Sequence, residues 1–322
     1  MRSLSGASLA IVTMLALGAV GCGKFGELKS MKAFKGANQA YQSQDYKKAS
    51  SLYEEAVASA PDSRPAHQSY FFLGNSYDNL YKPSKKGEAE NDALLQKAVD
   101  NYQKAAETLS KSEFPDDRKL GKLSLEYLVA AYGPDKLNDP AKAEPVVQKM
   151  IQMEPGEPAN YFSLAKIYED AGVYDEAEKV LLQAKQAKPN DPAVYMQLAG
   201  YYNRQGQFEK TIEALEERAS KEPTNPEAFY TISTYYWDKA YRDFKLRENE
   251  KMAYVQKGIE AVDHSLQIKP DYMEALVYKN LLLRLQANME KDPSKQQALI
   301  KQADVLRDKA QELRKQKAAG VS

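Results

Sequence analysis

Apolar residues recur at steps of three and four along most of the chain after residue 30. One such series consists of Tyr174, Ala177, Leu181 and Ala184. This spacing places the apolar side chains on one face of an α-helix, which can then pack against a neighbouring helix. No segment alternates apolar and polar residues between turn residues, so no strand is expected. The pattern predicts an all-α chain.

The helical pattern is itself repeated with a period of 34 residues. The recurring series are Pro155, Pro189 and Pro223; Pro158, Pro192 and Pro226; Tyr161, Tyr195 and Phe229; Leu164, Leu198 and Ile232; and Tyr168, Tyr202 and Tyr236. Five parallel series do not arise by chance. A fixed period of this length is typical of solenoids, in which each repeat is one supersecondary unit that packs only on its neighbours.

Local chemistry predicts two helices in each repeat. Asp191 and Asn225 each precede a proline, so they are expected to cap a helix whose first residue is that proline. Gly172 and Gly206 follow about one helix length later, where a first helix ends and a tight turn is needed. The second helix then runs to the next proline, so each repeat is predicted to be a helical hairpin.

A hairpin of this length, with this order of aromatic, Leu, Tyr, Gly, Ala and Pro positions, resembles the tetratricopeptide repeat (TPR). The resemblance implies a right-handed superhelical solenoid with six to seven copies over residues 31–289. Two copies carry long insertions, near residues 82–92 and 239–250, and the copy near residues 276–285 is degenerate.

The last segment, residues 290–322, is predicted to be a capping helix with a tail. Its apolar stripe is Leu299, Ala303, Leu306, Ala310 and Leu313. Such a stripe most simply covers the end of the array, which a solenoid needs for solubility. A partner-binding coiled coil is the alternative, although the stripe spans fewer than three heptads and two of its members are alanine.

The N-terminus has the pattern of a secretory signal. Arg2 supplies a positive start, and residues 3–23 carry no charge. The sequence Ala19-Val20-Gly21-Cys22 resembles the lipobox of bacterial lipoproteins. That resemblance implies that residues 1–21 are removed and that Cys22 is acylated. Cleavage by an ordinary signal peptidase and retention as an uncleaved anchor are the alternatives.

The residue that follows Cys22 indicates in which membrane a lipid-anchored protein is expected to lie. In the lipoprotein family an aspartate at this point retains the protein in the inner membrane, whereas this chain has Gly23. If the source has two membranes, an outer-membrane address facing the periplasm is implied. Residues 22–30 are expected to form a short tether. At about 3.3 Å per extended residue, the tether would hold the first repeat within roughly 30 Å of the lipid.

Composition argues against nucleic acid and against catalysis. Arg2 is the only charged residue before Lys24, so the chain without residues 1–21 has 44 basic and 45 acidic residues, with no basic excess for phosphates. His67 and His264 fall in different repeats, and there is no second cysteine, phosphate-binding loop or metal motif. No enzyme activity, cofactor or metal is expected.

The TPR resemblance also implies a binding surface, because the first helices of that family line a concave groove. The fifth repeat position carries Phe34, Phe71, Phe162, Met196 and Tyr230, and the ninth carries Asn38 and Asn75 in the first two copies. Trp237, at the twelfth position, has Tyr241 and Phe244 nearby. Large apolar side chains could anchor a partner. They could equally pack against the neighbouring helix.

The sequence therefore predicts a membrane-tethered, non-catalytic scaffold for protein interaction at the bacterial cell envelope. Its expected partners are unidentified envelope proteins, through the groove, and the membrane, through the lipid anchor. The carboxylate clamp of chaperone-binding relatives is missing, since Phe34 and Phe71 stand where that clamp has basic residues. The alternative is a small-molecule or glycan-binding lipoprotein with an aromatic pocket near Trp237.

Overall fold

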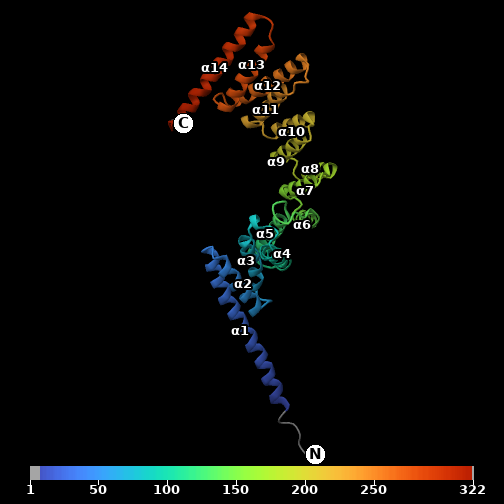
Figure 1. Ribbon diagram of the computed structural model, residues 1–322, viewed down its shortest axis with the longest axis vertical. Helices are drawn as coiled ribbons and strands as arrows, with labels where there is room; N and C mark the ends of the chain where they lie inside the picture. The colour runs from blue at the N-terminus through green and yellow to red at the C-terminus, as the bar shows by residue number, and fades with distance from the viewer. Residues whose placement is uncertain (1–7, 321–322) are drawn as a thin grey trace, which may run out of the picture. The chain divides into compact units, whose positions relative to one another are not determined.

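The structure is a computed structural model that describes residues 8–320, with side chains described from Lys24 onward. These residues form only helices and connecting loops (Figure 1). The helices are α1 (Ser8–Gln42), α2 (Tyr46–Ser59), α3 (Arg64–Leu80), α4 (Ala89–Leu109), α5 (Pro115–Tyr132), α6 (Pro140–Met153), α7 (Pro158–Asp170), α8 (Tyr174–Ala187), α9 (Pro192–Arg204), α10 (Phe208–Lys221), α11 (Pro226–Arg242), α12 (Glu248–Ile268), α13 (Met273–Met289) and α14 (Pro293–Ala318), with a 3₁₀ helix at Pro83–Lys85. The predicted all-α array of hairpins is confirmed.

The chain divides into two compact units. One unit comprises residues 1–155 with 166–172, and the other comprises residues 156–165 with 173–322. In the first unit α1 packs on α2, α3 on α4 and α5 on α6. In the second unit α9 packs on α10, α11 on α12 and α13 on α14. The second helix of a hairpin also packs on the first helix of the next, as α2 does on α3, α4 on α5, α10 on α11 and α12 on α13, so the core of a unit continues between hairpins.

The predicted caps and turns are present. Asp191 accepts a hydrogen bond from the backbone N–H of Ala193, and Asn225 accepts one from Glu227, so both residues cap the helices that follow them. Gly172 and Gly206 adopt φ values of 75° and 70°. A side chain is strained in this left-handed region, which explains why glycine ends the first helix in both repeats.

The two insertions lengthen helices more than they lengthen loops. The predicted insertion near residues 82–92 is shared between a loop with the 3₁₀ helix and the first turn of the 21-residue α4. The insertion near residues 239–250 is shared between the end of α11 and the start of the 21-residue α12, with a short connection between them. Both second helices are therefore longer than the 14-residue α8 and α10.

The tether prediction differs from the structure. Residues 24–30 are part of the continuous helix α1, and Ser30 is fully buried. Its hydroxyl lies 3.2 Å from that of Ser63, the N-cap of α3, so this part of α1 already packs against the second hairpin. At about 1.5 Å of rise per residue, a helix also spans less than half the length of an extended tether. Within the described residues no helix is long and apolar enough to cross a membrane.

The C-terminal helix α14 packs antiparallel on α13 and completes a seventh hairpin. All five residues of the predicted stripe are buried or half-buried, and Ala303 and Ala310 are the most buried. The Arg284 guanidinium of α13 donates a 2.6 Å hydrogen bond to Asp304 of α14, which fixes the pairing at the polar edge. The stripe therefore packs inside a hairpin, and the degenerate copy is structurally complete.

Candidate protein-interaction surface

Phe34 and Phe71 belong to the core of the first unit and do not form a free groove. Phe71 is 4% exposed, and its ring contacts Tyr102 and Tyr127. Phe34 is half-buried and lies 6.0 Å from the Tyr53 ring, measured between centroids. Two roles were open for these positions, anchoring a partner or packing against a neighbouring helix, and Phe71 packs. Phe71 is therefore not available as a groove residue, because Tyr102 of α4 and Tyr127 of α5 cover its ring.

The two asparagines of the ninth position have internal partners. The Tyr53 hydroxyl donates a 2.7 Å hydrogen bond to Asn38 Oδ1, and the Tyr41 hydroxyl donates one of the same length to Asn75 Oδ1. Asn75 is only 5% exposed and also accepts a bond from Asn79 Nδ2. The Asn38 amide therefore joins the two helices of the first hairpin, whereas Asn75 joins the first hairpin to the second and has little surface left for a ligand.

Asn75 does lie beside a polar pocket of about 460 Å³ within the first unit. The pocket is also lined by the ion pair between Lys136 and Asp78 and by Tyr81. The Tyr81 hydroxyl is buried and has no hydrogen-bond partner. Sequence reasoning gave no sign of this pocket, because its walls come from α1, α2, α3 and α5 and from two loops.

In the second unit, Phe162 and Met196 are half-buried. The Met196 sulfur accepts a 3.0 Å contact from Arg218 Nη1. The same guanidinium pairs with Glu222 at 2.8 Å and with Glu227 at 3.3 Å. The sulfur of Met196 therefore contacts a buried guanidinium that is already paired with two glutamates. Part of the Met196 side chain stays accessible to solvent.

Tyr230 and Trp237 belong to a row of five aromatic rings on α11, on α13 and at the N-cap of α13. In order of contact the rings are Tyr272, Tyr230, Tyr278, Trp237 and Tyr241, with centroids 5.5, 5.3, 5.7 and 4.9 Å apart. We call this set the aromatic row. The first three contacts are edge-to-face, which is a favourable geometry for aromatic pairs. Tyr278 and Tyr272 lie in the degenerate copy, where the sequence register was ambiguous, so sequence reasoning missed them.

The aromatic row is packed on one side and open on the other. Tyr230, Trp237 and Tyr272 contact a small core cluster that includes Ala240 and Val255, and Tyr241 is 55% exposed. The Tyr241 ring stacks parallel to the Trp237 indole at an interplanar angle of 10°. One face of Trp237 is therefore already covered. Phe244, expected in the same pocket, makes none of these ring contacts and is 93% exposed.

Electrostatics make the aromatic row a nearly neutral surface. Arg242 and Asp238 at its edge pair with each other at 2.7 Å. Burial, followed by the neighbouring Tyr278 and Tyr272, raises the pKa of Tyr230 to about 12. The phenol therefore stays protonated at neutral pH and can donate a hydrogen bond. Neutral aromatic surfaces of this kind supply the rigid anchors of protein interfaces.

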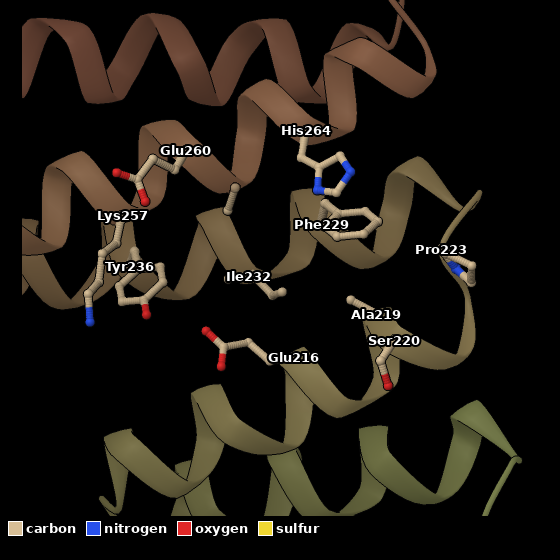
Figure 2. Close-up of a pocket in the computed structure, with 11 residues that line it drawn as sticks. Glu216, Ala219, Ser220, Pro223, Phe229, Ile232, Tyr236, Lys257, Glu260 and His264 are labelled. Carbon is tan, nitrogen blue, oxygen red and sulfur yellow. The ribbon is translucent and has the colours of Figure 1, made fainter.

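The second unit also has a cleft between α10, α11 and α12 (Figure 2). Its volume is about 520 Å³, and Ala219, Ile232 and Tyr236 form its buried floor. The rings of Phe229 and His264 lie against each other at one end, 4.0 Å between centroids. This Phe229–His264 cleft shares no residue with the aromatic row.

The two histidines lie in different units. His67 lies in α3 of the first unit and His264 in α12 of the second. In the part of the chain that the structure describes, no group of three His, Cys, Asp or Glu side chains is placed to hold a metal ion. Cys22, the predicted acylation site, lies outside the residues whose side chains are described.

Comparison with known proteins supports the repeat. A tetratricopeptide-repeat family model matches residues 136–200. No curated protein sequence matches the chain.

Several solved structures are similar. The C-terminal part of a TPR repeat-containing protein from Cytophaga hutchinsonii is 16% identical, with 87% of this chain and 98% of that chain covered and a TM-score of 0.53. A tetratricopeptide repeat protein from Parabacteroides merdae is 12% identical, with 86% and 99% covered and a TM-score of 0.46. MamA from Desulfovibrio magneticus is 15% identical, with 60% and 95% covered and a TM-score of 0.39.

The family match covers α6, the α7–α8 hairpin and most of α9. The similarity to the Cytophaga structure extends over most of the chain and concerns the fold alone. The chain has consecutive helical hairpins, glycine turns with positive φ, and helices that begin with proline after an Asp or Asn N-cap. It therefore has the fold of a tetratricopeptide-repeat protein.

Proposed function

We propose that this protein is a non-catalytic scaffold that binds a partner protein through the aromatic row. The observation that carries the proposal is the row itself, five rings in continuous contact on two neighbouring first helices and at the N-cap of α13. Interfaces concentrate their binding energy in clustered Tyr and Trp side chains with a water-excluding surround. A row that is fixed by packing below also loses little conformational entropy when a partner binds.

We further propose that Cys22 anchors the scaffold by lipid to the bacterial cell envelope, with the outer membrane facing the periplasm as the favoured location. The support is the sequence around Cys22 and the absence of charge before Lys24. Two or more acyl chains hold a protein stably at a membrane, whereas one holds it marginally. A helix that starts close to the anchor would then present the first hairpin near the lipid surface.

The glycan alternative receives less support. A pocket of about 280 Å³ adjoins Trp237, Tyr278 and Asn203. Sugar binding of the type proposed uses an open aromatic face, and the stacked Tyr241 covers one face of the indole. An extended edge-to-face row fits a peptide segment better, because successive side chains can contact successive rings.

Capture of envelope proteins by immobilised protein tests the scaffold proposal. Replacing Trp237 and Tyr278 with alanine removes the centre of the row, so the bound proteins should be lost while the helical circular dichroism signal is kept. Leu182→Ala, at an exposed apolar residue of α8 outside the row, is the control and should retain capture. Equal capture by all three proteins would contradict the use of this surface.

A further inference from the structure

The Phe229–His264 cleft lies where a recurring hydrogen bond is missing. At two earlier junctions within the units, a tyrosine of a first helix donates to a glutamate on the second helix of the preceding repeat, Tyr168 to Glu144 and Tyr202 to Glu178. The residue 34 positions after Glu178 is Ile212. Tyr236, the equivalent tyrosine, therefore has no carboxylate partner there, and the junction is left open.

Two carboxylates face the cleft without an ion pair. On α10 Glu217 pairs with Lys185, and at the end of this helix Glu222 pairs with Arg218. Glu216 at the cleft has no ion pair among the described residues. The same contrast holds on α12. There Glu250 pairs with Arg247 and Asp263 pairs with Lys279, but Glu260 at the cleft remains unpaired within residues 24–320.

The charges of the cleft leave a negative excess. Lys257 is the cation among the lining residues, and its ammonium lies 5.9 Å from the centroid of the Tyr236 ring. Burial and then the charge of Glu216, with Tyr254 and Glu260, raise the pKa of Tyr236 to about 12. A negative potential over this phenol is what two unpaired carboxylates produce.

The floor and walls suit a long, flat cation. Ile232 and Ala219 offer an apolar floor, and Figure 2 shows the Phe229 ring beside His264 at one end with Glu216 and Glu260 extending from facing helices. An arginine can lay its methylene stem on apolar atoms, stack its guanidinium on an aromatic face and bond carboxylates in two places. Lysine lacks the planar group that such stacking needs.

We propose that this cleft binds an arginine side chain carried by an apolar peptide segment of a partner protein. The proposal goes beyond the aromatic row and shares with the proposed function only the assumption that the partner is a protein. The two surfaces have no residue in common. Variants of one therefore report on that surface alone, and failure of one leaves the other standing.

His264 provides a direct readout. The chain has two histidines, so the full-length protein labelled with ¹³C at histidine Cε1 gives two signals, and His67 in the other unit is an internal reference. The probe is acetyl-Leu-Arg-Leu-amide at pH 7.5, compared with the same peptide carrying Gln or Glu in place of Arg. The arginine peptide should shift the His264 signal saturably and leave the His67 signal unchanged.

Charge-removing variants complete the test. Glu216→Gln with Glu260→Gln should weaken binding of the arginine peptide by about tenfold or more, because two charge-assisted contacts are lost. Glu213→Gln, on the same helix outside the cleft, should leave binding unchanged. Both glutamates of the cleft are exposed, so the fold should survive, which circular dichroism checks. Equal shifts with the Gln or Glu peptide, full binding by the double variant, or no shift of His264 would each overturn the proposal.

Discussion

The Tyr202 hydroxyl of α9 donates a 2.9 Å hydrogen bond to Glu178 of α8, and Lys210 of α10 reaches the same carboxylate oxygen at 2.9 Å. The carboxylate therefore joins three consecutive helices. The bond from Tyr168 to Glu144 repeats this link 34 residues earlier, and Tyr77 donates to Glu54 in the first two hairpins. A polar bond across each of these junctions fixes the register in which the hairpins stack.

Removing one of these hydroxyls should destabilise the protein, whereas removing an unpaired one should not. Tyr202→Phe leaves the Glu178 carboxylate short of a donor and should lower the free energy of unfolding by about 1 kcal/mol. Tyr81→Phe removes a buried hydroxyl that has no partner, so it should be neutral or stabilising. Urea unfolding followed by circular dichroism measures both. A larger loss for Tyr81→Phe than for Tyr202→Phe would contradict the bond assignments.

The buried carboxylate of Asp117 should make the first unit sensitive to acid. Its side chain is 2% exposed and accepts hydrogen bonds from Arg64, Gln68 and Ser112, which together outweigh burial and lower its pKa. A lowered pKa in the folded state stabilises the fold above the unfolded-state pKa of about 3.9, and this stability is lost as pH falls through the folded pKa.

The variant Asp117→Asn tests this link between α3 and α5. It removes the charge from the hydrogen bonds that Asp117 accepts and should cost about 2 kcal/mol at pH 7, less than for a fully buried pair because the Arg64 side chain is 45% exposed. The variant's stability should also change less than that of the wild type as pH is lowered below 5. Urea titrations at several pH values measure both effects. Parallel pH profiles for the two proteins would show that Asp117 does not contribute in this way.

Two helical glycines should respond oppositely to alanine. A Cβ at Gly121 would lie 2.6 Å from the backbone nitrogen of Ser110, so α4 and α5 would have to move apart. At Gly200 the nearest atom is the tip of Arg204, 3.3 Å away, which can move aside. Gly121→Ala should therefore lower the midpoint of thermal unfolding by several degrees. Gly200→Ala should leave it unchanged or raise it, since alanine favours helix by about 1 kcal/mol.

Substitution of Cys22 tests the lipid anchor. If the cysteine is acylated, Cys22→Ser should move the protein from the membrane fraction to a precursor or a soluble form, because the acyl chains that hold it are absent. Incorporation of radiolabelled palmitate should be lost in the same variant. Ser30→Ala, a control in the same helix, should keep both. Unchanged membrane fractionation of Cys22→Ser would rule out lipidation as the anchor.

The local chemistry of the chain predicted most of the fold. Proline with a preceding Asp or Asn, and glycine about 14 residues later, set the helix boundaries around Asp191 and Gly206, because these signals act within a few residues. The same signals do not report which side chains a neighbouring helix covers. For that reason the sequence left open whether Phe71 lines a groove or packs in the core, where the structure places it, and Tyr278 was missed although it joins Tyr230 to Trp237.

The insertions limited prediction for a related reason. Extra residues near 239–250 shifted the register, so the partner of Trp237 on α13 could not be found by counting 34. The open junction at Tyr236 does have a sequence signal, since Ile212 replaces the glutamate of the preceding repeat. The hydrogen bond that gives this replacement its meaning was visible only once α8 and α9 were placed side by side.

The central claim is that a partner protein binds across the aromatic row. The most direct measurement is photocrosslinking in cells of the source organism with benzoylphenylalanine placed at Tyr241, the most exposed ring of the row, or at exposed Leu182 of α8 as a control. The account predicts a discrete crosslinked protein at position 241 that is absent at position 182 and is lost when Trp237→Ala is added. A crosslink that persists with Trp237→Ala, or the same product at both positions, would contradict it.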